Sequence, residues 1–330
     1  MLPAEWEKQA AVWLTWPQNQ ETWGAIGKDA EVAYREIVRA ALRFQDVILL
    51  VDDAALGRRL QTELSPGARH KLETAVCPTN DSWTRDYGAL TARAGGELVT
   101  LDFTFNSWGG KYPPWDKDDA VPRFMAERRE RRAVEVDFVL EGGSIDVNGR
   151  GAMLTTRECL LNPNRNPKLA QGEIEEALRL WLGATDVIWL DAGIHGDDTD
   201  GHVDDLARFS DPRTVLCAVE SDARDENYAA LKANFASLNR HARGASLEAV
   251  EMPMPARQVK EGLRTPATYL NFLILNGAVL APVFRDKRDD DALQIFEKHF
   301  PGREIVPIDC RALVFGQGAI HCSSMQEPEE

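Results

Sequence analysis

Two periodicities alternate along the chain, and together they predict a mixed α/β protein. Apolar residues recur every three or four positions in five segments, a spacing that indicates amphipathic helices. These segments are 30–45, 118–133, 171–183, 226–242 and 290–300. Between them lie short apolar runs rich in Val, Ile and Leu, which are typical of strands. The runs are "VILLVDD", "LVTLDF", "VIWLDA", "TVLCAVE" and "NFLILNGAVLAPVF".

Turn dipeptides divide the strand-like runs into hairpins. They are Gly95-Gly96, Asn148-Gly149, Asp211-Pro212 and Asn276-Gly277, each between two apolar runs. The turns return at intervals of about 50 to 65 residues, with roughly one helix in each interval, which suggests a repeated unit. We therefore expect one domain over residues 1–330, built from five ββαβ units closed into a ring. The alternative is an open α/β sheet.

Composition narrows the class of partner. The formal net charge is −15, from 38 basic and 53 acidic residues, which argues against nucleic acid or an anionic membrane. Such a charge would attract a cationic small substrate. The alternative is that the acidic residues only keep the protein soluble. No apolar run is long enough for a membrane span, and the N-terminus shows no secretory signal. The five cysteines form no C-x-x-C pair, which favours a reducing, cytoplasmic location and no zinc site.

Polar clusters recur at a fixed distance before the predicted turns. Asp86 in "NDSWTRDYG", Glu141 in "LEGGSID", and His202 with Asp204 in "DTDGHVDDLARF" each precede a turn by seven or nine residues. If each cluster begins the first strand of its hairpin, all four side chains lie at the same end of the ring and converge. In an extended strand His202 and Asp204 point to one face. The alternative interpretation gives these residues no catalytic role. In it, Asp86 forms a surface ion pair, Glu141 belongs to a turn, and His202 and Asp204 lie in a solvated loop.

Cys322 in "GQGAIHCSSMQEP" is the candidate nucleophile. A thiol with a pKa of about 8.5 needs a basic or cationic neighbour to react at neutral pH. If "AIHCSS" is extended, His321 and Cys322 point to opposite faces, so we expect His202 to be the partner of the thiol. The competing interpretation is a buried core cysteine. Trp83 and Trp108 are core residues or walls of a substrate pocket.

Seven segments in order resemble the agmatine deiminase and bacterial-type peptidylarginine deiminase family of the guanidine-modifying (pentein) superfamily. They are "LPAEWEKQAAVWLTWPQNQETW", "NDSWTRDYG", "FNSWGGKY", "EGGSIDVNGRG", "CLLNPNRNP", "GDDTDGHVDDLARF" and "IHCSSMQEP", and they cover almost the whole chain. The resemblance implies a five-bladed α/β propeller of pseudo-symmetric ββαβ modules. This chain departs from the family around the nucleophile, where Gln317 and Ala319 precede it and Ser323 follows.

The resemblance also implies roles for the candidate residues. Cys322 takes the place of the nucleophile and His202 that of the general acid and base, while Asp86, Glu141 and Asp204 surround the guanidinium. Carboxylates bind the planar guanidinium bidentately, with each oxygen accepting an N–H hydrogen bond, so Asp86 and Asp204 are expected to hold it. Glu141 is expected to orient His202 and to favour its protonated form. No metal or organic cofactor is required.

The remaining expectations concern the substrate. Asp198 is a candidate for the far amine, Gly318 for a close approach of backbone to substrate, and "FNSWGGKYPPWDK" (105–117) for a lid. The leading hypothesis is hydrolysis of agmatine to N-carbamoylputrescine and ammonia. The alternatives are a peptidylarginine deiminase, an amidinotransferase and a non-catalytic protein that binds cationic amines. The oligomeric state stays open, with a homo-oligomer as one option.

Overall fold

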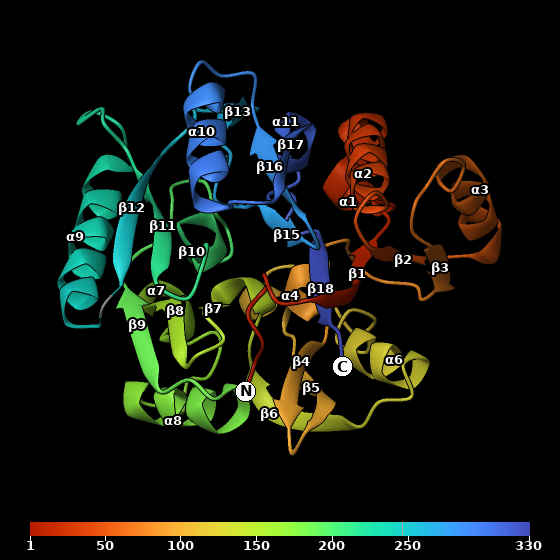
Figure 1. Ribbon diagram of the computed structural model, residues 1–330, viewed down its shortest axis with the longest axis horizontal. Helices are drawn as coiled ribbons and strands as arrows, with labels where there is room; N and C mark the ends of the chain where they lie inside the picture. The colour runs from red at the N-terminus through yellow and green to blue at the C-terminus, as the bar shows by residue number, and fades with distance from the viewer. Residues whose placement is uncertain (246) are drawn as a thin grey trace.

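The computed structural model describes residues 1–245 and 247–330, and it arranges small sheets around a common centre (Figure 1). The larger helices lie at the periphery of this arrangement, outside the sheets. The strands that form the sheets are β1 (Gln9–Thr15), β2 (Asp46–Val51), β3 (Leu72–Val76), β4 (Leu90–Ala94), β5 (Glu97–Thr104), β6 (Ala133–Val139), β7 (Asp146–Val147), β8 (Ala152–Thr156), β9 (Asp186–Leu190), β10 (Ala207–Phe209), β11 (Thr214–Val219), β12 (Glu248–Pro253), β15 (Leu273–Leu275), β16 (Ala278–Val283), β17 (Glu304–Asp309) and β18 (Ser324–Pro328).

Within the described residues, five sheets share one pairing pattern. In each sheet an antiparallel pair is followed by a strand added in parallel, as in β4-β5-β6, β7-β8-β9, β10-β11-β12 and β15-β16-β17. The fifth sheet, β18-β1-β2-β3, repeats the pattern with one more parallel strand. A small hairpin of β13 (Val259–Lys260) and β14 (Leu263–Arg264) stands apart. All four predicted turns connect the two strands of an antiparallel pair, as predicted.

Each parallel pairing is bridged by a helix, because a parallel connection needs a long crossover. The five predicted helices are confirmed as α2 (Gly27–Ala41), α6 (Val121–Arg128), α8 (Gln171–Leu182), α9 (Tyr228–Ala245) and α10 (Asp289–His299). Their apolar faces pack on the sheets, as where Phe272 meets Phe296 with ring centroids 5.1 Å apart. The sequence patterns did not reveal α3 (Ala54–Leu64), which begins where Asp53 accepts hydrogen bonds from two backbone N–H groups. Among the described helices, none is both long and apolar enough to cross a membrane.

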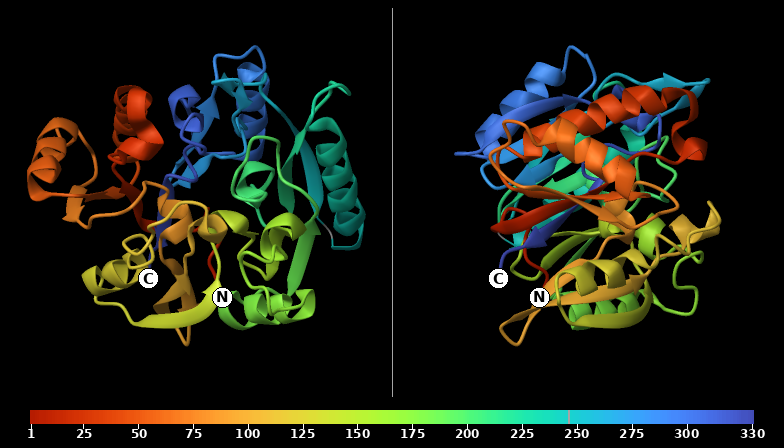
Figure 2. Two further views of the ribbon diagram at one scale, coloured as in Figure 1. Left: turned by 180° about the vertical axis from the view of Figure 1, so that it is seen from behind. Right: turned by 90° about the vertical axis from the view of Figure 1, so that its right-hand side faces the viewer.

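The strand that follows the candidate nucleophile joins the two ends of the chain. β18 pairs antiparallel with β1, and the termini lie close together in the two views of Figure 2. Buried Glu327 in β18 accepts hydrogen bonds from the Trp13 indole at 2.9 Å and from Arg129 and Arg131 at 2.8 and 2.9 Å. These contacts fix the register of β18 against β1, and so the position of the turn before it.

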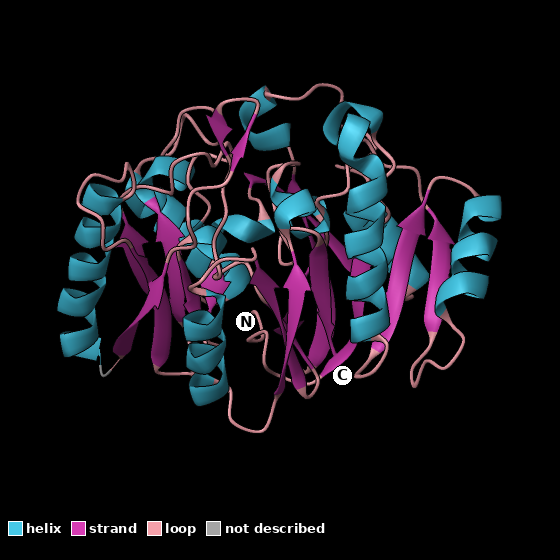
Figure 3. Ribbon diagram, turned by 90° about the horizontal axis from the view of Figure 1, so that it is seen from above, coloured by secondary structure: helices cyan, strands magenta, loops and turns pink. Residues whose placement is uncertain are grey.

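One expectation about the backbone stays a prediction, and another differs from the structure. In the described residues no sheet closes on itself, because every sheet has two edge strands, so the closed ring of five units stays a prediction. Strands and helices alternate across the view of Figure 3, but the candidate catalytic segments are short helical turns rather than strands. Asp86 lies in α4 (Thr84–Tyr87), Glu141 precedes η2 (Gly142–Ser144), and His202 and Asp204 begin η3 (Val203–Asp205).

Side-chain hydrogen bonds to the backbone explain these turns. The hydroxyls of Ser323 and Ser324 donate to the carbonyls of Ala319 and Ile320 at 2.7 and 2.9 Å, so these carbonyls turn away from any strand ladder. The expectation that "AIHCSS" is extended is therefore wrong. Likewise, Asp197 accepts from the backbone N–H groups of Gly201 and His202, which bends the chain before η3.

Candidate active site

The candidate residues come from the same position in each of the five sheets. Each precedes the first strand of an antiparallel pair: α4 precedes β4, η2 precedes β7, η3 precedes β10, Asn271 precedes β15, and Cys322 precedes β18. Because the sheets surround a common centre, these segments meet there (Figure 1). The predicted convergence of the polar clusters is confirmed by the contacts between them, although the segments are turns.

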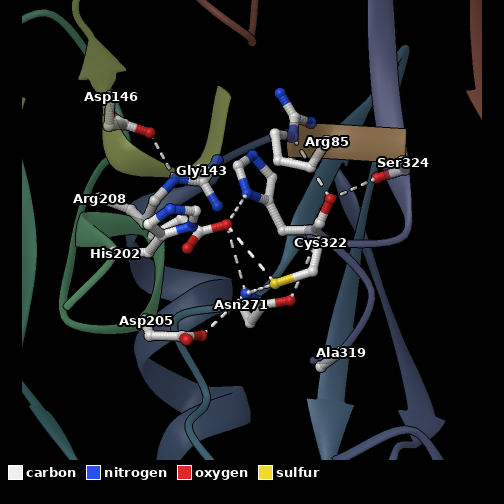
Figure 4. A network of polar contacts seen from close by, with 12 residues as sticks. Arg85, Gly143, Asp146, His202, Asp205, Arg208, Asn271, Ala319, Cys322 and Ser324 are labelled. Atoms are coloured by element: carbon white, nitrogen blue, oxygen red, sulfur yellow. Dashed lines mark hydrogen bonds and ion pairs between the residues drawn. The ribbon is translucent and has the colours of Figure 1, made fainter. Parts of the chain in front are cut away.

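Cys322 is buried among amide and carboxylate groups. Its sulfur accepts a hydrogen bond from Asn271 Nδ2 at 2.9 Å and lies 3.8 Å from Asp204 Oδ2. Asn271 also holds the backbone, since its Oδ1 accepts from the Cys322 N–H at 3.1 Å (Figure 4). Burial, then the charges of Asp204, Asp205 and Asp86, raises the pKa of the thiol well above its usual range. The thiol is therefore neutral in the empty site.

Asp204 links the thiol to the neighbouring histidine. Asp204 Oδ2 lies 2.7 Å from His321 Nδ1, and His321 Nε2 lies 2.9 Å from Glu5 Oε2. Burial alone would raise the pKa of Asp204, but the hydrogen bond and the charge of His321 lower it below its usual value. His321 makes no direct contact with the sulfur among the described residues, but both contact the same carboxylate oxygen. The expectation that His321 lies away from the site is therefore wrong.

Asp86 faces the site from the opposite sheet. Its Oδ2 accepts a hydrogen bond from the Trp108 indole at 2.9 Å, and its Oδ1 accepts from the Gly143 N–H at 3.1 Å. Burial, followed by the charge of Asp204, raises the pKa of Asp86 well above its usual range. A Cβ at position 143 would lie 2.6 Å from His202 Nδ1 and 2.7 Å from Asp86 Oδ1. The second glycine of "EGG" thus leaves room for both side chains.

His202 stands ready for a ligand rather than for the thiol. Its Nδ1 lies 3.5 Å from Asp86 Oδ1, and neither ring nitrogen has a hydrogen-bond partner in the described part of the chain. The expected direct pairing of His202 with Cys322 is absent there. Burial lowers the pKa of His202, although the charges of Glu141 and Asp204 oppose this shift. Glu141 therefore favours the protonated form, as expected, but burial outweighs it.

Arg165 holds Glu141 in place. Its Nε donates to Glu141 Oε1 at 2.6 Å, and its other nitrogens donate to Asp200 Oδ2 at 2.5 Å and to the Thr199 carbonyl at 2.8 Å. Arg165 and Glu141 are both fully buried. This guanidinium therefore ties Glu141 to the loop that carries His202.

A cavity of about 750 Å³ opens onto these groups. Its lining includes five of the predicted residues, which are Trp83, Asp86, Trp108, Asp198 and Cys322. Glu141, His202 and Asp204 are almost fully buried, at 1% exposure or less. Reactive groups thus lie at the base of a cavity that bears tryptophan and carboxylate walls.

Gly318 and Asp198 shape the walls of this cavity. A Cβ at position 318 would lie 2.5 Å from the Trp83 ring and 2.9 Å from Cys322 Cβ, so Gly318 lets the backbone pack between them. Asp198 accepts a hydrogen bond from the Tyr112 hydroxyl, and burial raises the pKa of Asp198. Lys111 donates to the Asp198 carbonyl and lies 2.8 Å from Asp200 Oδ1.

Sequence reasoning missed three polar residues of the site. Arg165 lies in the quoted segment "CLLNPNRNP", Glu5 in "LPAEW", and Asn271 at the start of "NFLILNG", which was assigned to a strand. The sequence signal for Arg165 was that a charged residue stands among turn-forming Asn and Pro residues. The signal for Asn271 was that a polar residue stands directly before an apolar hairpin, the position that the other candidates occupy in their sheets.

Comparison with known proteins agrees with this geometry. A model of the Porphyromonas-type peptidyl-arginine deiminase family matches residues 1–328. The agmatine deiminase of Pseudomonas aeruginosa (strain LESB58) is 37% identical over 99% of this chain and 95% of its own length. A Cys-to-Ser variant of Campylobacter jejuni agmatine deiminase, solved with substrate bound, superposes with a TM-score of 0.91 at 34% identity, covering 100% of this chain and 97% of that one. Agmatine deiminase of Enterococcus faecalis superposes with a TM-score of 0.92 at 33% identity, covering 99% and 95%. The chain belongs to the Porphyromonas-type peptidyl-arginine deiminase family.

Proposed function

We propose that this protein is an agmatine deiminase, which hydrolyses agmatine to N-carbamoylputrescine and ammonia. The observation that carries the proposal is the position of Cys322, whose sulfur lies among Asn271, Asp204 and the base of an acidic cavity. A buried thiol surrounded by carboxylates is a poor nucleophile until a cation joins it. Agmatine supplies that cation. The relatives named agmatine deiminases support the same choice.

Asp86 and Asp204 hold the guanidinium in this proposal. Asp86 lies 3.5 Å from His202 Nδ1 and Asp204 lies 3.8 Å from the Cys322 sulfur, and the buried Oδ1 of Asp204 has no hydrogen-bond partner in the described part of the chain. A guanidinium presents its N–H donors in one plane, which suits two carboxylates. Trp83 and Trp108 flank the alkyl chain, and Asp198 faces the far ammonium. A bound cation also relieves the repulsion between the carboxylates, and a neutral ureido product does not.

The reaction proceeds through a covalent intermediate on Cys322. The sulfur attacks the guanidinium carbon, and the proton given up by the thiol is the one that His202 delivers to the departing nitrogen. The C–N bond breaks, ammonia leaves, and a thiouronium remains on the sulfur. Water then adds to the carbon while His202 accepts its proton, the C–S bond breaks, and the thiol is restored. The positive charge of the guanidinium leaves as ammonium, because the proton taken from water joins the released ammonia, and the far ammonium of the substrate is unchanged.

Steady-state kinetics with three substrates test this proposal. We expect kcat/KM to be highest for agmatine, lower for free arginine, and lowest for a peptidylarginine. Three lysines and six carboxylate residues line the cavity, but no arginine among the described residues lines it to bind a substrate carboxylate. A peptidylarginine preferred over agmatine would favour the alternative deiminase and overturn the assignment.

A nucleophile variant separates an enzyme from a non-catalytic binding protein. Cys322→Ser should lower kcat by about a thousandfold or more, because the hydroxyl cannot replace the thiolate, while agmatine still binds. Wild-type protein that binds agmatine without releasing ammonia would instead support a cationic-amine binding protein. Release of ammonia without an amine acceptor would exclude an amidinotransferase.

We further infer that residues 1–330 form one five-bladed α/β propeller domain that acts in the cytoplasm on a small guanidinium substrate. The shared pairing pattern of the five sheets supports five modules. The acidic net charge of −15 supports the absence of nucleic-acid and membrane partners. No step of the proposed reaction uses a metal or organic cofactor. A homo-oligomer remains part of the proposal, and light scattering during gel filtration would measure its mass.

A further inference from the structure

A second cysteine lies behind the active site, beside its histidine. Glu141, Cys159 and His202 place a carboxylate oxygen, a thiol sulfur and an imidazole nitrogen within 4.8 Å of one another. Cys159 belongs to α7 (Arg157–Leu160), and all three side chains are at most 1% exposed. The proposed reaction gives Cys159 no role. Its burial raises the thiol pKa well above the usual range, followed by the charge of Glu141, so it carries its proton in the empty site.

Polar atoms of this cluster lack hydrogen-bond partners in the described part of the chain. Glu141 Oε2 and both ring nitrogens of His202 are buried without a hydrogen-bond partner among the described residues. Arg165 occupies only Glu141 Oε1, at 2.6 Å, and leaves Oε2 free. Such buried unpartnered atoms cost free energy unless a ligand meets them. None of the three side chains is among the residues that line the cavity, whereas Asp86, which lies 3.5 Å from His202 Nδ1, does line it.

The donor set matches one class of ligand. Thiolate, imidazole and carboxylate together are the ligands of Zn²⁺, which takes them at about 2.0 to 2.3 Å in a tetrahedron. Such bonds place the donor atoms about 3.3 to 3.6 Å apart, so the cluster, whose donor atoms lie within 4.8 Å of one another, needs to contract by up to about 1.5 Å. Asp86 Oδ1, which belongs to a further carboxylate, lies 3.5 Å from His202 Nδ1.

We propose that Glu141, Cys159 and His202 bind one Zn²⁺ ion and that this ion inhibits the enzyme. Binding forms Zn–S, Zn–N and Zn–O bonds and releases the proton of the Cys159 thiol. The metal takes the His202 lone pair that would carry the proton to and from substrate, so catalysis stops while the nucleophile stays intact. This Zn²⁺ is an inhibitor and takes no part in the reaction.

Charge around the cluster favours a dication. Asp86 Oδ1 lies 3.5 Å from His202 Nδ1, so a further carboxylate borders the cluster, while the buried Arg165 guanidinium, 2.6 Å from Glu141 Oε1, opposes a cation there. The thiolate and Glu141 neutralise the ion itself.

Cobalt spectroscopy tests the site without turnover. Co²⁺ bound to a thiolate shows an intense near-ultraviolet charge-transfer band, and we would titrate Co²⁺ alone into four proteins. The band should appear in wild type, in Cys322→Ser and in Cys217→Ser, and it should be lost in Cys159→Ser. Cys217 is a matched control because it is equally buried but lies in β11. A band that is lost in Cys322→Ser and kept in Cys159→Ser would place the metal at the other cluster, Asp204, Asp205 and Cys322, and overturn the proposal.

Inhibition gives a second readout. Zn²⁺ should inhibit agmatine hydrolysis by wild type, and Cys159→Ala should raise the half-inhibitory concentration at least about tenfold, as losing one ligand does. Cys159→Ala is the second variant because a methyl group replaces a small buried thiol with little change in shape. Equal inhibition of both proteins would refute the site. Because Cys322→Ser binds metal without turning over, failure of the metal site and failure of the proposed function give different results.

Discussion

At the scale of single residues, burial and the neighbouring carboxylates decide whether Cys322 is a thiol or a thiolate. The sulfur has carboxylates on one side and a neutral amide on the other, so nothing in the empty site stabilises a thiolate. The guanidinium of the substrate is the missing cation, and its arrival lowers the thiol pKa by charge alone. If Cys322 is the nucleophile, as proposed, it stays unreactive toward other electrophiles until substrate is present.

This coupling predicts how Cys322 reacts with two alkylating reagents. Neutral iodoacetamide should modify it slowly at pH 7, and faster as the pH rises past 9, because only the thiolate reacts and its pKa is raised. The cationic reagent 2-chloroacetamidine should react at least about tenfold faster at pH 7, since it brings its own charge. Mass spectrometry of the Cys322 peptide measures both rates. Equal rates for the two reagents would contradict the model of a substrate-activated thiol.

Asp86→Asn is the control for this experiment. Removing that carboxylate should abolish the advantage of the cationic reagent. It should not slow iodoacetamide, because Asp86 is among the charges that raise the thiol pKa. Loss of both reactivities would indicate a collapsed site.

Arg165 is a positioning residue, and its variants test how Glu141 acts. Arg165→Met leaves Glu141 buried without its partner, and we expect kcat to fall about 10- to 100-fold as the general acid loses its orientation. Arg165→Lys keeps the charge but not the three-way contact, and it should recover part of the loss. A purely structural role would lower the melting temperature while leaving kcat and the pH profile of the folded fraction unchanged.

Residue types predicted the site better than backbone geometry did. Asp86, Glu141, His202 and Asp204 were proposed from sequence because each stands in a polar cluster before a turn, and Cys322 was proposed from the family resemblance. The arguments about which way His321 and Cys322 point failed because they assumed a strand. Serine hydroxyls that bind the backbone carbonyls of Ala319 and Ile320 decide that conformation, and hydrophobic periodicity carries no sign of them.

At the scale of elements, the segment with α5 (Ser107–Gly110) covers the cavity by means of an unusual backbone. Ser107 and Trp108 have positive φ angles of 54°, which aim the Trp108 indole at Asp86. Asn106 and Asn164 brace the segment, since Asn106 Nδ2 donates to the Asn164 carbonyl at 2.9 Å. The segment therefore joins a catalytic carboxylate to the predicted lid.

Two neighbouring glycines allow this bracing to be tested. Gly109 and Gly110 have φ angles of 88° and 81°, but a Cβ on Gly109 would approach Asn164 Cβ to 2.8 Å, whereas one on Gly110 meets nothing within 4 Å. Both alanine variants carry similar backbone strain of about 1 kcal/mol. Gly109→Ala should in addition displace the segment and raise KM for agmatine about tenfold or more. Equal KM values for the two variants would show that the Asn164 contact does not position Trp108.

The regular elements were predictable because they have a period, and the short ones were not. Five helices and the strands of the four predicted hairpins follow from apolar spacing and turn dipeptides, whereas the β13-β14 hairpin was not predicted. The turns α4, η2 and η3 hold the catalytic side chains in three or four residues each, which is too short for any hydrophobic period. The residues proposed to act in catalysis therefore lie in segments whose conformation hydrophobic periodicity does not predict.

At the scale of the whole molecule, one buried arginine joins three distant parts of the chain. Arg208 in β10 donates to Asp146, to Glu5 Oε2 at 2.7 Å and to the Phe272 carbonyl at 2.9 Å, and it stacks 4.5 Å above the Phe272 ring. Glu5 in turn contacts His321. This network connects three sheets to the segment of the nucleophile.

Arg208→Met should be strongly destabilising. It leaves Glu5 and Asp146 buried without their cation, and we expect a loss of about 3 to 5 kcal/mol in the free energy of unfolding. Arg224→Met is the matched control because its ion pair with Asp222 is exposed, and it should change that free energy by less than about 0.5 kcal/mol. Urea denaturation measures both. A loss below about 1 kcal/mol for Arg208→Met would show that water replaces the arginine.

The pairing of β18 with β1 has a consequence for how the protein is made. β18 follows every other described element, so it leaves the ribosome after the cavity walls, the carboxylates and His202 have been synthesised. Until then β1 keeps a free edge, which is a surface that chaperones or other chains can bind. A nascent chain therefore contains Asp86, Glu141, His202 and Asp204 before Cys322 is added. In the proposed reaction, deiminase chemistry begins only when β1 pairs with the strand that follows Cys322.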